Sequence, residues 1–193
     1  MSRPAEESSL ALEQFREYLR LLARLQMPAQ LQGKLDPSDL VQLTLLKAHQ
    51  AEGDFRGTTH AERAAWLRQI LARTMANAVR DHARGKRDVH LERSLEAALH
   101  QSSTRLEAWL VAGGDSPSGQ AQRNEQVVEL AAALARLPEP QRDALVLRYC
   151  QGLSLIEISA KLGRSRAAVA SLLRRGLGHL RELLAAEDPQ SSS

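Results

Sequence analysis

The chain has 193 residues and a net charge of +3, and 43% of its residues are hydrophobic but only 3% are aromatic. This length allows one or two small domains, whose cores must be built from Leu, Ala, Val and Ile. The single cysteine, Cys150, excludes an internal disulfide and a cysteine-based zinc site, and no run reaches the roughly 20 apolar residues that a membrane span needs. We therefore expect an all-α, cytoplasmic protein in which Cys150 is a buried, inert thiol.

Two helices are predicted before the first glycine-bounded loop. The apolar residues from Leu12 to Leu22 recur at three- and four-residue spacing, which predicts an amphipathic helix of about 20 residues that ends or bends at Met27-Pro28. The second helix begins at Asp36-Pro37, with Asp36 as the N-cap and Asp39 where a capping-box acid would lie. It continues to about Glu52 and is apolar around much of its circumference. We expect it to be heavily buried, or buried on one side and bound to a partner on the other.

A third helix is predicted to begin near His60, with an apolar stripe on one side and a polar, mostly basic face on the other. Asp81 is the only acid between Glu62 and Asp88, which favours contact with a nucleic acid over an ordinary solvated face. Trp66 is either a core residue or a stacking platform for an unpaired base. The residues of the polar face and of the segment that follows it are Gln69, Arg73, Asn77, Arg80, Arg84, Lys86 and Arg87.

The character of the sequence changes after Leu91. Residues 94–98 favour a short helix, and Ser102-Ser103-Thr104 is expected to interrupt it. The apolar patch around Trp109 is either a local packing contact or a docking point for another protein. The glycine- and serine-rich run at residues 113–119 is typical of a flexible linker, so we expect two small helical bundles joined by such a linker.

The C-terminal part is predicted to hold a helix from about Gln122 and then three helices within Leu137 to Leu184. Gly152 and Gly163 suit helix ends, and Ser154 and Ser165 suit the N-caps of the helices that follow. Two helices joined by such a tight turn form a helix-turn-helix. No acid occurs between Ile158 and Arg181, which favours a DNA-binding unit over a helical hairpin with a solvated basic face.

The motifs of the first bundle and of the last bundle resemble one family. Asp36-Pro37-Ser38-Asp39-Leu40-Val41-Gln42 resembles the Asp-x-x-Asp-Leu-Val-Gln signature of bacterial RNA polymerase sigma factors. Phe55-Arg56-Gly57 and Trp66-Leu67 resemble the next part of the same domain. Leu137-Pro138, with Gln141-Arg142 and the helix-turn-helix, resembles the promoter-binding C-terminal domain. The size resembles the extracytoplasmic function (ECF) class of the sigma-70 family, with a region 2-like domain at 10–92, a linker at 93–121 and a region 4-like domain at 122–186.

The resemblance implies the partners and the residues that would meet them. The partners would be core RNA polymerase, through its β′ clamp helices and β flap, and promoter DNA, and an anti-sigma factor is left open. The polymerase-binding residues would be Asp36, Asp39, Leu40 and Gln42. The −10 element would be met by Trp66, Arg73, Asn77, Arg80, Arg84, Lys86 and Arg87. The −35 element would be met by Arg164, Ser165, Arg166, Ala167, Ser171, Arg174 and Arg175.

Some positions depart from the family pattern. Leu43 stands where members often have an acid, and Ala170 and Leu172 stand at two usually basic positions of the recognition helix, which implies a weaker or altered −35 contact. Gly176 and Gly178 fall inside the same helix, where each costs about 1 kcal/mol relative to Ala. Two alternatives are a helix-turn-helix regulator that never touches polymerase and a sigma-like adaptor. The six histidines lack metal spacing, and no Walker loop or nucleophile elbow occurs, so we expect no enzyme, cofactor or metal.

Overall fold

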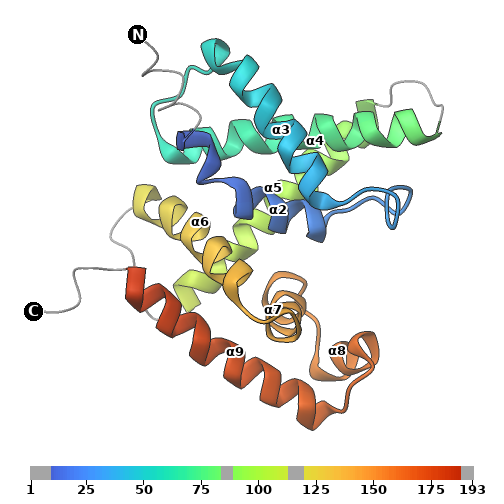
Figure 1. The fold of residues 1–193 in the computed structure, drawn as a ribbon, viewed down its shortest axis with the longest axis vertical. Coiled ribbons are helices and arrows are strands. Elements are labelled where there is room, and N and C mark those ends of the chain that lie inside the picture. Colours follow the sequence, from blue (N-terminus) through green and yellow to red (C-terminus); the bar gives the residue numbers. More distant parts are fainter. Residues whose placement is uncertain (1–9, 84–88, 113–119, 188–193) are drawn as a thin grey trace, which may run out of the picture.

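The computed structural model describes residues 10–83, 89–112 and 120–187, and these residues form helices and turns without a strand, so the all-α expectation is confirmed. No helix within these ranges is both long and apolar enough to span a membrane. Figure 1 shows the helices in two groups, α2–α4 above and α7–α9 below, with α5 and α6 between them. The helices are α2 (Arg16–Leu25), α3 (Pro37–Gln50), α4 (His60–Ala83), α5 (Val89–Ala112), α6 (Gln120–Arg136), α7 (Glu139–Leu145), α8 (Leu155–Leu162) and α9 (Arg166–Glu187).

The first predicted helix is broken. A helical turn at residues 10–13 is followed by a turn at Gln14 and Phe15, and α2 begins only at Arg16, so a single helix of that length is wrong. Phe15 is fully buried and its ring stacks on His60 with the centroids 4.5 Å apart. The break thus accompanies the burial of an aromatic ring, whose packing outweighs the loss of a few helical hydrogen bonds.

The start of α3 follows the predicted local chemistry. Asp36 has an extended backbone and its side chain accepts the N–H of Ser38 at 2.7 Å, while Pro37 occupies the first helical turn. This bond to the backbone and the Ser38 hydroxyl lower the pKa of the Asp36 carboxyl below its ordinary value. The prediction of Asp36 as the N-cap is confirmed.

Helix α5 corrects the expected break after residue 98. It is continuous through Ser102 and Ser103, which are both buried. The Tyr18 hydroxyl donates to Ser103 Oγ at 3.0 Å, and Gln26 Nε2 donates to Ser102 Oγ at 2.9 Å. Because α2 satisfies both hydroxyls, the serines can lie on a buried helical face at little cost. The predicted linker at residues 113–119 lies outside the described residues.

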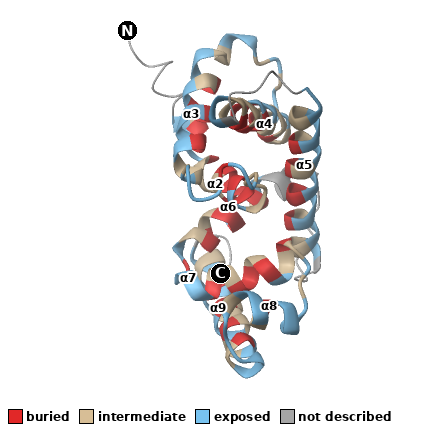
Figure 2. Ribbon diagram, turned by 90° about the vertical axis from the view of Figure 1, so that its right-hand side faces the viewer, coloured by how far each residue is buried: buried red, intermediate tan, exposed pale blue. Residues whose placement is uncertain are grey.

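The two halves of the molecule share one hydrophobic core. Helix α5 runs along one side of the molecule from the upper group to the lower one (Figures 1 and 2). Near its lower end, the Trp109 ring stacks on Tyr149 with the centroids 4.5 Å apart and the planes within 5°. Helix α6 packs against α2, α4, α5 and α9. Leu134 and Leu145 consequently belong to the same buried cluster as Leu19 and Leu67.

The C-terminal unit has the predicted helix-turn-helix. After α7, a π-helical turn (Val146–Cys150) leads to Gly152, whose φ of 73° closes the helix. Ser154 and Glu157 form a reciprocal capping box at the start of α8, and Gly163 ends α8 in the left-handed conformation. A small separate core of Leu147, Ile158 and Val169 holds α8 and α9 together.

Gly176 has a packing role that the sequence did not indicate. A Cβ added there would lie 3.0 Å from Leu145 Cδ1 and 3.3 Å from Gln141 Cβ, whereas a Cβ added at Gly178 would meet nothing within 4 Å. The glycine at 176 therefore allows α9 to approach α7 closely, which offsets part of its cost in helix propensity.

Candidate nucleic-acid interface

The turn before α9 and the N-terminal part of α9 present a basic face, which we call the recognition-helix face (Arg164, Arg166, Ala170 and Arg174). All four side chains are exposed. Arg166, Ala170 and Arg174 are spaced four residues apart and therefore lie along one side of the helix. Other sides of the helix are held by Val169, which is fully buried, and by Leu172, which is also buried.

The other predicted −35 residues divide between surface and support. Ala167 and Arg175 are exposed, and Ser171 is half-buried. The Ser165 side chain accepts the N–H of Ala168 at 3.2 Å, so Ser165 is occupied as a helix cap. The small side chains of Ala167 and Ala170 leave the middle of the face shallow, so the backbone of a partner molecule can approach closely between the arginines.

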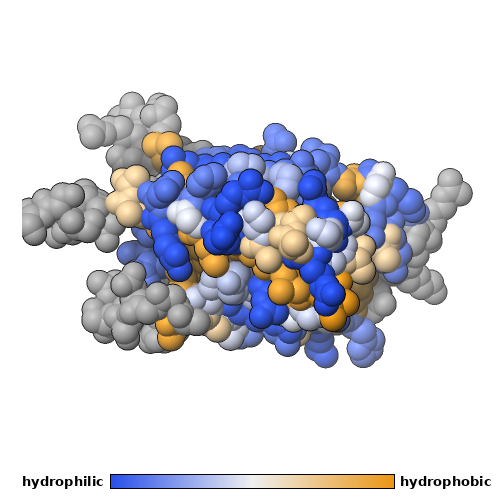
Figure 3. Space-filling model, turned by 90° about the horizontal axis from the view of Figure 1, so that it is seen from below, coloured by the Kyte–Doolittle hydropathy of each residue, from blue (hydrophilic) through white to orange (hydrophobic). Residues whose placement is uncertain are grey.

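The charge on this face is uncompensated. Within the described residues, no ion pair or side-chain hydrogen bond involves the guanidinium groups of Arg164, Arg166 or Arg174. Glu157 is the acid nearest to this face in the sequence. Its carboxylate accepts hydrogen bonds from the hydroxyl and from the backbone N–H of Ser154, and these bonds lower the pKa of the carboxyl. The end of the molecule formed by α7–α9 is mostly hydrophilic, with smaller hydrophobic areas between (Figure 3). Such a face can neutralise phosphates without first breaking internal pairs.

Helix α4 carries the second basic face, which we call the α4 face (Arg73, Asn77 and Arg80). Here the arginines are paired: Arg73 Nε donates to Glu92 Oε1 of α5 at 3.1 Å, and Arg80 Nε lies 3.5 Å from Asp81 Oδ1. Asn77 is half-buried, and the Arg73 side chain is 61% exposed. The predicted −10 residues Arg84, Lys86 and Arg87 lie outside the described residues.

Trp66 lies beside the α4 face as a packed residue. It is half-buried against the core, and its ring lies 5.1 Å from that of Phe55. A Cβ at Gly57 would lie 2.5 Å from Phe55 Cζ, so glycine is required for this loop to fold onto the ring. The geometry favours the core interpretation of Trp66 over an open stacking platform.

Helix α3 presents a third surface, which we call the α3 apolar face (Leu43 and Leu46). Asp36, Asp39 and Gln42 are exposed and therefore accessible to a partner. Leu40 is only 3% exposed, so its side chain belongs to the core of the free chain. Sequence reasoning missed Leu43 and Leu46, which are 42% and 52% exposed. Their spacing from Asp39 and Gln42, four residues in each case, was the signal that could have placed them on one face.

The prediction that Cys150 is buried is confirmed. Burial raises the pKa of its thiol to about 12, which disfavours the reactive thiolate.

Two family models match the chain. Residues 14–85 match "Sigma-70 region 2", and residues 128–180 match "Sigma-70, region 4". The α3 apolar face and the α4 face lie within the first match, and the recognition-helix face lies within the second. The order of the two regions along the chain agrees with the resemblance seen in the motifs.

Proteins with similar sequences are also named as sigma factors. RNA polymerase sigma factor SigZ of Bacillus subtilis is 45% identical over 60 residues, which are 31% of this chain and 34% of that protein. ECF RNA polymerase sigma factor SigG of Mycobacterium tuberculosis is 32% identical over 153 residues, 75% of this chain and 41% of that protein. ECF RNA polymerase sigma factor SigM of Mycobacterium tuberculosis is 29% identical over 172 residues, 88% of this chain and 74% of that protein.

The match spans about a third of the length of SigZ and two fifths of that of SigG. The two regions nevertheless occur together in this chain, in order, and each contains one of the two basic helices described above. With its similarity to proteins named as ECF sigma factors, the chain belongs to the sigma-70 family of RNA polymerase sigma factors, in the ECF class.

Proposed function

We propose that the chain binds core RNA polymerase and directs promoter-specific transcription initiation, by recognising the −10 and −35 elements and helping to melt the −10 region. The α3 apolar face carries this proposal. A DNA-binding regulator needs a recognition helix, but it has no use for two exposed leucines beside Asp39 and Gln42 on a helix far from that recognition helix. An exposed apolar pair rimmed by polar groups suits a protein partner.

The proposed polymerase contacts follow from the same exposure. Leu43, Leu46, Asp39 and Gln42 would meet the β′ clamp helices, with Asp36 fixing the start of α3. The C-terminal unit would meet the β flap, where α8 exposes Leu155 and Ile156. An anti-sigma factor is a further partner to be sought, by pull-down from the native host.

The proposed DNA contacts divide between the two basic helices. Arg166 and Arg174 would enter the major groove of the −35 element with the N-terminal part of α9, where Ala167 and Ala170 allow close approach. The α4 face would follow the −10 phosphates, and the charge of Arg84, Lys86 and Arg87 would extend that track. The proposal assigns no catalytic chemistry to the chain and places it with polymerase in the cytoplasm.

Run-off transcription with purified core polymerase tests the proposal. The template is selected from a randomised DNA library by the complex of the chain with core polymerase. The double variant Leu43→Asp/Leu46→Asp should lose core binding and transcripts, because two charges would be buried in an apolar contact. Binding of −35 duplex should remain. Val111→Asp is the matched control, since Val111 is a 49% exposed apolar residue on α5.

Each other outcome has a definite meaning. DNA binding by the unmodified chain without any association with core polymerase would identify a helix-turn-helix regulator. Association with core polymerase without transcripts from any template would identify an adaptor. Asp39→Ala should weaken core binding and leave −35 binding intact, and an unchanged affinity for core would remove Asp39 from the interface.

A further inference from the structure

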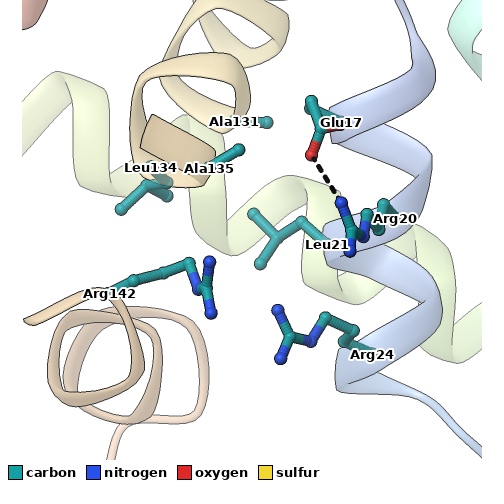
Figure 4. Close-up of a pocket in the computed structure, with 8 residues that line it drawn as sticks. All are labelled: Glu17, Arg20, Leu21, Arg24, Ala131, Leu134, Ala135 and Arg142. Carbon is teal, nitrogen blue, oxygen red and sulfur yellow. Dashed lines mark ion pairs between the residues drawn. The ribbon is translucent and has the colours of Figure 1, made fainter. Parts of the chain in front are cut away.

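Three arginines from the two halves of the chain converge on a small pocket, which we call the arginine pocket (Arg20, Arg24 and Arg142). Arg20 and Arg24 come from α2, and Arg142 comes from α7. Their guanidinium groups point into the space between α2 and the α6–α7 corner (Figure 4). The remaining lining is Glu17, Leu21, Ala131, Leu134 and Ala135, so the floor is apolar and one carboxylate is present.

The positive charge of the pocket is only partly balanced. Glu17 Oε2 lies 3.8 Å from Arg20 Nη1, so the carboxylate of the pocket is already paired with one of the three arginines. Arg24 is exposed and has no ion pair within the described residues. The three guanidinium groups are therefore set against two carboxylates, Glu17 in the pocket and Asp143 beside Arg142, and the remaining like-charge repulsion costs free energy, most where water is displaced.

Arg142 supplies an independent indication of a missing partner. Its side chain is 19% exposed, and its Nε is buried without a hydrogen-bond acceptor in the described part of the chain. Asp143 Oδ1 lies 3.6 Å from Nε, which is an ion-pair contact like that of Arg80 with Asp81 but is too long for a hydrogen bond. A buried guanidinium N–H without an acceptor is costly, and an anion entering the pocket would remove that cost.

We infer that the arginine pocket binds the phosphate group of a small phosphorylated molecule. Guanidinium groups pair with phosphate through parallel charge-assisted hydrogen bonds, which carboxylate-poor surroundings favour. The small pocket with its apolar floor suits a single phosphate group, with the rest of the ligand outside. Because α2 and α7 would both hold the ligand, its binding would favour the packed arrangement of the two halves over any arrangement in which they separate. The inference does not depend on the proposed function.

The first test is titration calorimetry of the full chain with inorganic phosphate and with pyrophosphate, at constant ionic strength. We expect saturable binding, with Arg142→Gln and Arg24→Gln each weakening it by about tenfold or more, as expected for loss of one charge-assisted bond. Arg16→Gln is the matched control, because Arg16 also lies on α2 but pairs with Glu13 at 2.6 Å and does not line the pocket. A circular dichroism spectrum of each variant checks that the helices are retained.

The second test separates the two sources of phosphate. Duplex DNA without promoter elements is titrated against the same variants. Thermal unfolding of each variant is also measured with and without pyrophosphate. We expect Arg24→Gln and Arg142→Gln to abolish the stabilisation by pyrophosphate and to leave the affinity for duplex DNA within about twofold of the unmodified chain. Equal protection of the unmodified chain and of the Arg24→Gln and Arg142→Gln variants would reveal general salt stabilisation and overturn the inference. Loss of duplex affinity without saturable pyrophosphate binding would overturn it as well, in favour of DNA phosphates.

Discussion

The α4 face and the recognition-helix face carry similar arginines in different surroundings. On α4, Arg73 is paired with Glu92 of α5 and Arg80 lies beside Asp81. On α9, Arg166 and Arg174 have no ion pair within the described residues. DNA must therefore compete with a protein carboxylate at α4, whereas phosphates can bind directly at α9. The difference teaches that two basic helices in one chain can have unequal access to DNA even when their sequences look alike.

The largest expected effect tests this inequality directly. Arg166→Glu should weaken binding of a −35 duplex by about 10- to 100-fold, because one phosphate or base contact contributes about 1–3 kcal/mol and the reversed charge adds repulsion. Arg73→Glu should weaken binding of a −10 single strand by less, since the lost charge was already paired. Fluorescence anisotropy at fixed salt measures both.

Arg181→Glu is the control for the first comparison, because Arg181 is exposed on the same helix about four turns further along. Equal losses at Arg166 and Arg73 would show that the ion pair with Glu92 does not limit access to the α4 face.

Helix α5 holds the two basic helices in one body, and its Trp109 stacks on Tyr149 of the C-terminal unit. Trp109→Ala should lower the free energy of unfolding by about 1–3 kcal/mol, through loss of the stacked ring and its buried area. Urea unfolding followed by circular dichroism measures this loss. Val111→Ala, at an exposed position two residues away, should change the free energy of unfolding little. A Trp109 variant as stable as the control would mean that the stacked ring does not stabilise the joining of the two halves.

The two capping boxes permit a matched comparison of the helices that position each face. Ser154→Ala should cost about 1 kcal/mol of unfolding free energy at pH 7 and weaken −35 binding, because α8 supports α9. Thr59→Ala should have a similar cost and leave −35 binding unchanged, since Thr59 Oγ1 and Glu62 form the corresponding pair at the start of α4.

The same variants predict a pH dependence. Hydrogen bonds from Ser154 lower the pKa of the folded Glu157 carboxyl. A lowered folded pKa contributes stability that is present above the ordinary carboxyl value and is lost as the pH falls through the lowered one. The gap in stability between the unmodified chain and Ser154→Ala should therefore narrow on acidification. Urea midpoints measured between pH 7 and pH 3 test this, and a gap that widens would contradict the pairing.

The smallest expected effect concerns the support of α9. Gly178→Ala should raise the free energy of unfolding by about 0.5–1 kcal/mol, because the added methyl meets open space and alanine favours a helix. Gly176→Ala should gain less than this or lose stability, because its methyl would press on Leu145 of α7. Thermal unfolding compares the two. A Gly176 variant as stabilised as the Gly178 variant would show that Leu145 yields freely.

The helix caps and the two basic helices could be predicted from the sequence alone, whereas the break before α2 and the continuity of α5 could not. Asp36, Ser154 and Gly163 act on backbone groups a few residues away, so their roles can be read locally. The order of the two sets of motifs also predicted the family, because each motif is a short continuous run.

Which of those residues are accessible to a partner depends on how the helices pack together. Helices α2 and α4 cover the side of α3 that carries Leu40, so Leu40 is buried and Leu43 is exposed. Because α3 is apolar around much of its circumference, its sequence does not show which side will be covered. Ser102 and Ser103 continue α5 because Gln26 and Tyr18, far away in the sequence, satisfy their hydroxyls. Capping and periodicity are local properties, whereas burial and pairing depend on which distant residues meet, and that is settled by packing.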